Sequence, residues 1–260
     1  MSNPAMAMDH APMRGFAPNH RWDRNFYLIM VGLAWLGILR GFGGEIVQRV
    51  AHNSAPYPII VHFHAVIFVL WLVLFTVQVL LIRSKKVSVH KSLGFALVYL
   101  AVAMALIGPA TALTVQHHGM ASPDADPGFL SIQFTDILAF VGLTGAAIVL
   151  RKKAAAHKRL VLLGTLYITD AGYARWLAHR IIGALGGPTY WHFWLALYAG
   201  PVVLTAVVGI YDLATRKRLH PAYVAGAAYM FAVQMLAVSL YMSPAWPPVA
   251  KHLIAAWPWG

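Results

Sequence analysis

Residues 57–94 read YPIIVHFHAVIFVLWLVLFTVQVLLIRSKKVSVHKSLG, and this stretch decides the class of the protein. It contains an apolar run of the length that crosses a bilayer as a helix, about 20 residues. Two histidines stand at the head of the run, a basic loop closes it, and a second apolar run begins after His90. We therefore expect a membrane protein with titratable side chains at depths where the bilayer makes them costly.

The composition extends this expectation to the whole chain. Hydrophobic residues make up 60% of the 260 positions and charged residues only 11%, which is too little polar surface to cover a soluble globule. The formal net charge of +12 does not indicate a nucleic-acid partner, because the Lys and Arg residues punctuate apolar runs. The chain has no cysteine, which excludes disulfides, thiolate metal sites and thiol catalysis.

Seven apolar segments predict an all-α integral membrane bundle of seven transmembrane helices. A helix is the only open-ended element that satisfies its own backbone hydrogen bonds in lipid. The expected spans are residues 26–43, 57–82, 92–115, 129–150, 159–182, 190–213 and 221–242. We expect three parts: a polar cytoplasmic tail (1–25), the transmembrane domain (26–243) and a Trp- and Pro-rich interfacial tail (244–260).

The loops predict the orientation. Lys and Arg cluster after the second, fourth and sixth spans, whereas loops 116–128 and 183–189 contain neither. By the positive-inside rule, the N-terminus is cytoplasmic and the C-terminus lies outside. We read no removable signal peptide and expect the first span to act as an uncleaved signal, in a multi-pass protein of a bacterial cytoplasmic (inner) membrane.

Three charged residues are candidate catalytic residues. A rise of about 1.5 Å per residue places Asp136 and Arg175 at similar heights in the outer third of the bilayer, so we expect them to form an ion pair. Asp170 lies deeper and has no obvious partner in the sequence, apart from Tyr or Thr side chains of the bundle. Acidic residues inside a membrane are functional candidates, although structural pairs also occur.

Four histidines at the same level are candidate metal ligands: His62, His64, His179 and His192. Residues two apart on a helix point about 200° from one another, so His62 and His64 cannot both face the bundle from a regular helix. We favour His64 inward, because it heads a stripe of helical spacing. The stripe consists of His64, Phe68, Trp71, Phe75 and Gln78. The alternative is that each histidine is simply hydrogen-bonded at the interface.

His90 and His157 occupy equivalent places in a repeated pattern, Lys-Lys-x-x-x-His-Lys-x-Leu, at residues 85–93 and 152–160. The repeat indicates either a duplicated helical hairpin or the usual lysine content of short cytoplasmic loops. The two imidazoles could be axial ligands of a b-type haem, or ordinary cations at the membrane boundary. In the polar tail, four residues suit soft copper, or have no role: Met6, Met8, His10 and Met13.

The motifs together resemble a broad group of uncharacterised bacterial multi-pass membrane proteins. More distantly, they resemble cytochrome b561-like and cytochrome-oxidase-assembly membrane proteins. The resemblance covers about residues 57–175 and rests on His62-x-His64, Trp71, Gln78, His90-Lys91-x-x-Gly94 and His157-Lys158-Arg159-Leu160. It implies haem or metal handling with electron transfer. The outer histidines depart from the spacing that a two-haem b561 protein requires.

These observations lead to three hypotheses of function. The first is electron transfer or oxidoreduction with haem b or non-haem iron or copper. Quinol or a respiratory complex would supply the electrons, and the cofactor would be held by His90, His157, Trp71 and Gln78. The second is a proton-coupled transporter in which Asp136 and Asp170 are protonatable stations. The third is a non-catalytic respiratory assembly factor. The sequence does not specify the oligomeric state.

Overall fold

The computed structural model describes residues 16–53, 56–187 and 189–259, and this part of the chain is helical without strands. The predicted copper ligands Met6, Met8, His10 and Met13 lie outside the described residues. The elements are α1 (Asp23–Ala51), α2 (Ile59–Arg83), α3 (Val87–Gly119), η1 (Pro127–Phe129, a 3₁₀ turn), α4 (Leu130–Val149), α5 (Ala154–Tyr167), α6 (Asp170–Leu185), α7 (Tyr190–Arg216), α8 (Pro221–Met242) and α9 (Trp246–Ala255).

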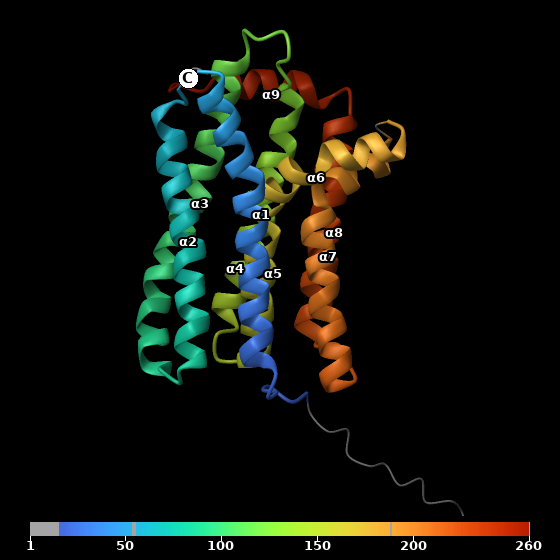
Figure 1. Ribbon diagram of the computed structural model, residues 1–260. Coiled ribbons are helices and arrows are strands. Elements are labelled where there is room, and N and C mark those ends of the chain that lie inside the picture. The colour runs from blue at the N-terminus through green and yellow to red at the C-terminus, as the bar shows by residue number, and fades with distance from the viewer. Residues whose placement is uncertain (1–15, 54–55, 188, 260) are drawn as a thin grey trace, which may run out of the picture.

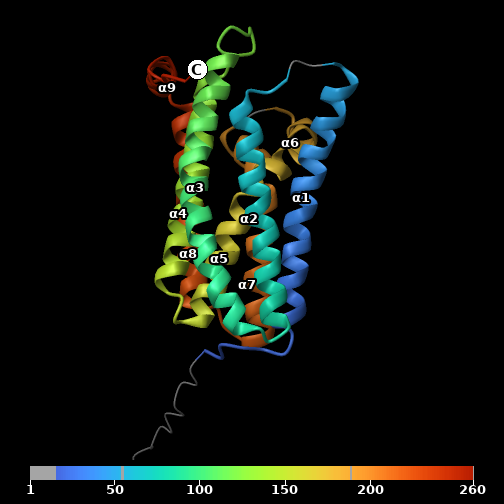
Figure 2. The same cartoon turned by 90° about the vertical axis from the view of Figure 1, so that its left-hand side faces the viewer.

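Six helices of the described chain are long and apolar enough to cross a membrane: α1, α2, α3, α4 with η1, α7 and α8. They run side by side as a bundle (Figure 1, Figure 2). Large apolar side chains such as Leu106 and Val50 are more than two-thirds exposed on the flanks, where a bilayer would cover them. This confirms an all-α architecture typical of a multi-pass membrane protein.

The fifth expected span, residues 159–182, is not one helix. It is divided into α5, which ends at Tyr167, and α6, which begins at Asp170. At about 1.5 Å per residue, the 14 residues of α5 and the 16 residues of α6 are each shorter than a hydrocarbon core of about 30 Å. Figure 1 shows that α6 leaves the bundle axis that α5 follows.

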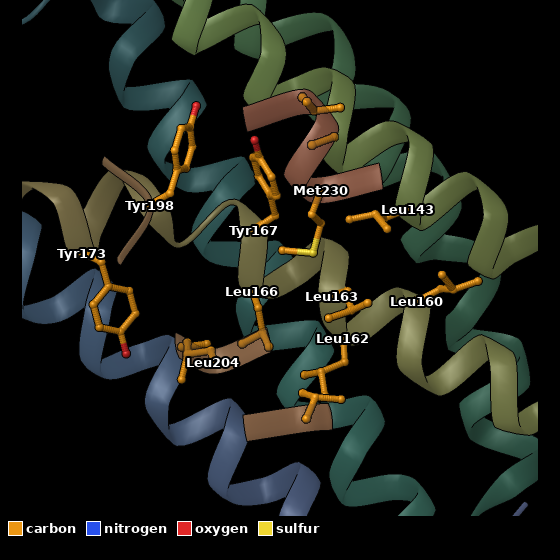
Figure 3. Packing of buried hydrophobic residues seen from close by; sticks show 14 of the residues in the cluster. Leu143, Leu160, Leu162, Leu163, Leu166, Tyr167, Tyr173, Tyr198, Leu204 and Met230 are labelled. Atoms are coloured by element: carbon orange, nitrogen blue, oxygen red, sulfur yellow. The ribbon is translucent and has the colours of Figure 1, made fainter. Parts of the chain in front are cut away.

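Short α5 is nevertheless the centre of the core. Leu162, Leu163 and Leu166 have no exposed surface, and α4, α7 and α8 pack around them. Figure 3 shows these leucines together with Leu143 of α4 and Met230 of α8. A helix surrounded in this way is held by its neighbours, so its own length does not limit its stability.

The loops divide between the two ends of the bundle. The α2–α3, α4–α5 and α7–α8 loops lie at the end where α1 begins, and we call this the basic end because the lysines and arginines of those loops gather there (Figure 1). At the opposite end, α9 lies across the bundle. The indole N–H of Trp246 donates to the Gly128 carbonyl at 2.9 Å, and that of Trp257 donates to Thr114 Oγ1 at 2.9 Å. The Trp-rich tail is therefore packed onto η1 and α3.

Glycines bring the backbone of α6 against α1. A Cβ added to Gly41 would lie 2.1 Å from the carbonyl oxygen of Gly172, and one added to Gly172 would lie 2.5 Å from that of Gly37. Small residues four apart on a helix permit this close approach in membrane bundles. The Tyr173 hydroxyl then donates to the Leu33 carbonyl at 2.8 Å. These contacts fix the first turn of α6 beside α1.

Candidate functional site

The break between α5 and α6 is encoded by the local sequence. The hydroxyl of Thr169 donates to the Leu166 carbonyl at 2.6 Å. Asp170 is the first residue of α6, where the partial positive charge of the helix N-terminus favours an acidic side chain. Short polar side chains that bond nearby backbone groups favour helix ends over helix interiors. The break therefore places an acidic side chain at the start of α6, inside the bundle, where Asp170 is only 4% exposed.

Four side chains from four helices meet beside this break, and we call them the Asp–Tyr cluster: Asp136 of α4, Tyr167 of α5, Asp170 of α6 and Tyr198 of α7. The two carboxyl groups are neighbours that act on each other electrostatically. The two tyrosine rings lie 6.0 Å apart between centroids. Their hydroxyls point to the same side, away from the leucine core (Figure 3).

The cluster contains polar atoms that the described residues leave unsatisfied. Tyr167 and Tyr198 have no exposed surface, and neither hydroxyl makes a hydrogen bond of normal geometry, although the two lie near each other. One oxygen of Asp136, Oδ1, also has no partner. Each buried polar group without a partner costs about 1–3 kcal/mol. Such groups are rare in folded proteins, and they mark places where a water, an ion or a substrate can bind.

The expected ion pair between Asp136 and Arg175 does not form. Arg175 Nε donates to Glu45 Oε2 at 2.7 Å instead, and the Tyr57 hydroxyl donates to the other oxygen of Glu45. The prediction failed because it treated residues 159–182 as one straight helix. After the break, α6 packs on α1, so Arg175 meets Glu45 of α1.

The two acidic residues consequently share a buried site without a cation bound to either of them in the described structure. The guanidinium of Arg175 is paired with Glu45 instead. Two adjacent carboxylates repel strongly in an apolar interior, whereas one carboxylate and one carboxylic acid attract. The pair is therefore suited to hold a single proton and to exchange it.

The four outer histidines do not converge. His62 and His179 are exposed, and the His192 ring donates from Nδ1 to the Gly187 carbonyl at 2.6 Å, at the start of α7. His64 faces inward, as expected from its stripe, and stacks on Phe68 with 4.0 Å between ring centroids. No three His, Asp or Glu side chains of the described residues lie close enough together to hold a metal ion. The predicted set of non-haem iron or copper ligands is thus not assembled.

The expected haem residues make contacts between helices. The Trp71 indole N–H donates to Thr165 Oγ1 at 3.2 Å, and Gln78 Nε2 donates to the His90 carbonyl at 3.2 Å. His157 Nδ1 donates to the Ala147 carbonyl at 2.8 Å. The imidazoles of His90 and His157 are close enough to interact electrostatically, and His90 Nδ1 is buried without a partner.

A second buried polar network, at the basic end, was not anticipated. Arg159 of α5 binds Asp212 of α7 through two hydrogen bonds, Nε–Oδ2 at 2.6 Å and Nη2–Oδ1 at 2.5 Å, and both side chains are 1% exposed. Arg216 bridges Asp212 to Asp23 of α1, whose carboxylate also accepts from Lys158 at 2.7 Å. We call these five residues the ion-pair network.

Some of these features had signals in the sequence. Thr169 and Asp170 are residues of the types that commonly begin helices, so their position inside the fifth span indicated a break there. The chain has only eight acidic residues, and Asp23 and Asp212 both lie near the basic loops, which suggested partners for the arginines. Tyr167 and Tyr198 had no such signal, because aromatic residues are common in apolar spans.

Comparisons with models of known protein families, with curated proteins and with solved structures give no match to this chain.

Proposed function

We propose that this chain is a proton-coupled transporter of a bacterial cytoplasmic membrane, and that the Asp136–Asp170 pair carries the proton. In this proposal the chain crosses the bilayer seven times, with α5 and α6 sharing the fifth crossing. The basic end faces the cytoplasm, because lysines and arginines are retained on that side, and α9 faces outward.

The observation that supports this function is a pair of neighbouring carboxyl groups beside a broken helix, with Asp170 buried and Asp136 partly buried. Interrupted transmembrane helices place backbone groups and helix ends inside the bilayer, and transporters use such sites to bind ions and substrates. A proton that moves between Asp136 and Asp170 needs no metal and no cofactor. The Tyr198 hydroxyl lies near Asp136 and can donate to it when that carboxylate is charged, and the Tyr167 hydroxyl lies beside that of Tyr198.

The break between α5 and α6 can also act as a hinge. Thr169 separates two helices whose main partners differ, since α5 packs chiefly on α4 and α8, whereas α6 packs on α1 and α7; α5 makes a smaller contact with α7 as well. Loss or gain of the shared proton changes the repulsion between Asp136 and Asp170, and therefore the preferred distance between α4 and the start of α6. Protonation is in this way coupled to the position of α6.

Proton flux in proteoliposomes tests the proposal. The purified full-length chain is reconstituted with a pH-sensitive dye inside the vesicles, and an imposed pH gradient is allowed to dissipate. We expect Asp170→Asn and Asp136→Asn to abolish the protein-dependent flux, because an amide cannot release a proton. Asp124→Asn removes an exposed loop acid and should leave the flux unchanged. Equal flux in folded Asp170→Asn and wild-type protein would refute the proposal.

A redox protein with haem at His90 and His157 is a second candidate, and one observation favours it. The chemistry of the pair fits the cofactor, because His157 makes the hydrogen bond to a backbone carbonyl that haem-ligating histidines commonly make, while His90 has an unpartnered ring nitrogen. When bound, haem would supply one-electron transfer, with quinol or a respiratory complex as redox partner. An absorption spectrum separates the candidates: a Soret band that His157→Ala removes would support the redox function, and a colourless, folded protein would reject it.

A further inference from the structure

A groove lies between α1 and α6, toward the end of the bundle opposite the basic end, and what it suggests does not depend on transport. It has a volume of about 640 Å³, is open to the outside of the bundle, and has two arginines among its walls, Arg40 of α1 and Arg180 of α6. The other lining residues are mostly apolar or small, and Leu39 and Val47 are each more than 60% exposed along its edge. A membrane would cover this face with acyl chains.

The charge of the groove is not balanced by protein. Neither Arg40 nor Arg180 forms an ion pair with a carboxylate of the described residues. Glu45, on the same helix as Arg40, is already bound to Arg175. The Arg40 guanidinium lies over the ring of Trp176, 5.3 Å from its centroid, and the buried indole N–H of Trp176 has no hydrogen-bond acceptor in the described structure.

The depth of the groove favours a bound anion. At about 1.5 Å per residue, Arg40 lies roughly 25 Å along α1 from its first residue, within a hydrocarbon core of about 30 Å. A guanidinium that faces lipid at this depth is costly unless it reaches the headgroup layer or binds an anion. Guanidinium groups bind phosphate through paired, charge-assisted hydrogen bonds.

We propose that the α1–α6 groove binds the phosphate headgroup of an anionic phospholipid, with Arg40 and Arg180 on the phosphate and the apolar edge against an acyl chain. A lipid is preferred over free phosphate, because the groove is mostly apolar and opens where acyl chains would lie. The bound headgroup bridges α1 to α6 and so limits the movement of α6.

The groove offers a variant that blocks the ligand without altering charge. A Cβ added to Gly44 would have no heavy atom within 4 Å, so the groove has open space where this side chain begins, and Gly44→Leu extends apolar atoms from a lining residue of the groove. Leucine is also the better helix former. Gly32 is an exposed glycine of the same helix, also with open space around it and outside the groove. Gly32→Leu is therefore the matched control.

Native mass spectrometry of the detergent-purified full chain, titrated with phosphatidylglycerol, tests the proposal. We expect one tightly bound lipid, and about tenfold weaker binding of it in Arg40→Ala/Arg180→Ala and in Gly44→Leu. Gly32→Leu and the charge-matched Arg151→Ala/Lys152→Ala should bind as the wild type does. The variant Arg40→Lys/Arg180→Lys keeps both charges, so its affinity for phosphatidylglycerol should lie between those of the wild type and the alanine variant. It replaces the alanine variant in the test if that variant does not fold.

Three results would overturn the proposal. The first is unchanged phosphatidylglycerol binding in the folded Gly44→Leu protein. The second is an equal loss in Arg151→Ala/Lys152→Ala, which would reduce the effect to net charge. The third is binding of inorganic phosphate as tight as that of the lipid, which would remove the role of the apolar edge.

Discussion

The two buried polar regions of this molecule differ in how their charges are matched. In the ion-pair network, every acidic residue faces at least one cation, and Arg159 and Asp212 meet through two short hydrogen bonds. In the Asp–Tyr cluster, two acidic residues face each other, and the hydroxyls of Tyr167 and Tyr198 have no partner in the described structure. Both regions join α5 or α6 to α7, yet only the ion-pair network provides its buried polar groups with partners.

The difference separates what holds the bundle from what can change in it. A matched buried pair has one strongly preferred arrangement, because removing either partner leaves an uncompensated charge. A pair of like groups has two nearly equivalent arrangements, which differ in the location of one proton. The ion-pair network thus ties α1, α5 and α7 at the basic end. In the proposed function, the Asp–Tyr cluster makes the start of α6 responsive to protonation.

The largest expected effect is on the ion-pair network. Arg159→Ala leaves Asp212 buried with only the longer contact to Arg216, 3.5 Å away, so we expect the free energy of unfolding to fall by about 3–5 kcal/mol. Thermal unfolding of the purified protein in detergent measures the change. Arg151→Ala, which removes an exposed arginine bonded only to the Ile148 carbonyl, should cost under about 0.5 kcal/mol. Similar melting of the two variants would mean that the network is not structural.

A smaller effect is expected for the Asp–Tyr cluster. Asp136→Asn keeps the shape and the hydrogen-bonding capacity of the side chain while it removes one of two like groups. We therefore expect the free energy of unfolding to change by less than about 1 kcal/mol, in either direction, although flux is lost. The same thermal measurement applies. Destabilisation as large as that of Arg159→Ala would assign the cluster a structural role, and the cluster would then not differ from the ion-pair network in this respect.

The smallest effect concerns the start of α8. His220 Nδ1 accepts from the Ala222 backbone N–H at 3.0 Å, which requires a neutral ring. Burial, followed by the nearby Arg159 guanidinium, lowers the pKa of His220 below its ordinary value of 6.5, with Asp212 opposing. As the pH falls, His220 is protonated in the unfolded chain at a higher pH than in the folded protein. Stability should therefore rise with pH between the folded pKa and 6.5, and fall on acidification.

Melting temperatures between pH 7.5 and 5.5 check this prediction. His220→Asn retains a helix-capping side chain that does not titrate, so its melting temperature should depend less on pH than that of the wild type. The two proteins should melt alike at pH 7.5. An identical pH dependence in both would show that His220 is not the titrating group.

Local patterns in the sequence were sufficient for several features. Six of the seven expected spans match single helices of the structure. The spacing of Trp71, Phe75 and Gln78 predicted the buried face of α2 and the inward position of His64. The clustering of Lys and Arg predicted which loops share an end. Each of these follows from residue type and helical period alone, because both are properties of a single segment.

Only the tertiary structure decided which charged groups meet. The partner of Arg175 depends on the direction that α6 takes after Thr169, and that direction depends on the contact of Gly172 with Gly41 on another helix. Asp136 and Asp170 meet for the same reason. Contacts between helices are set by packing among segments far apart in the chain, and hydrophobic periodicity within one segment carries no information about its neighbours.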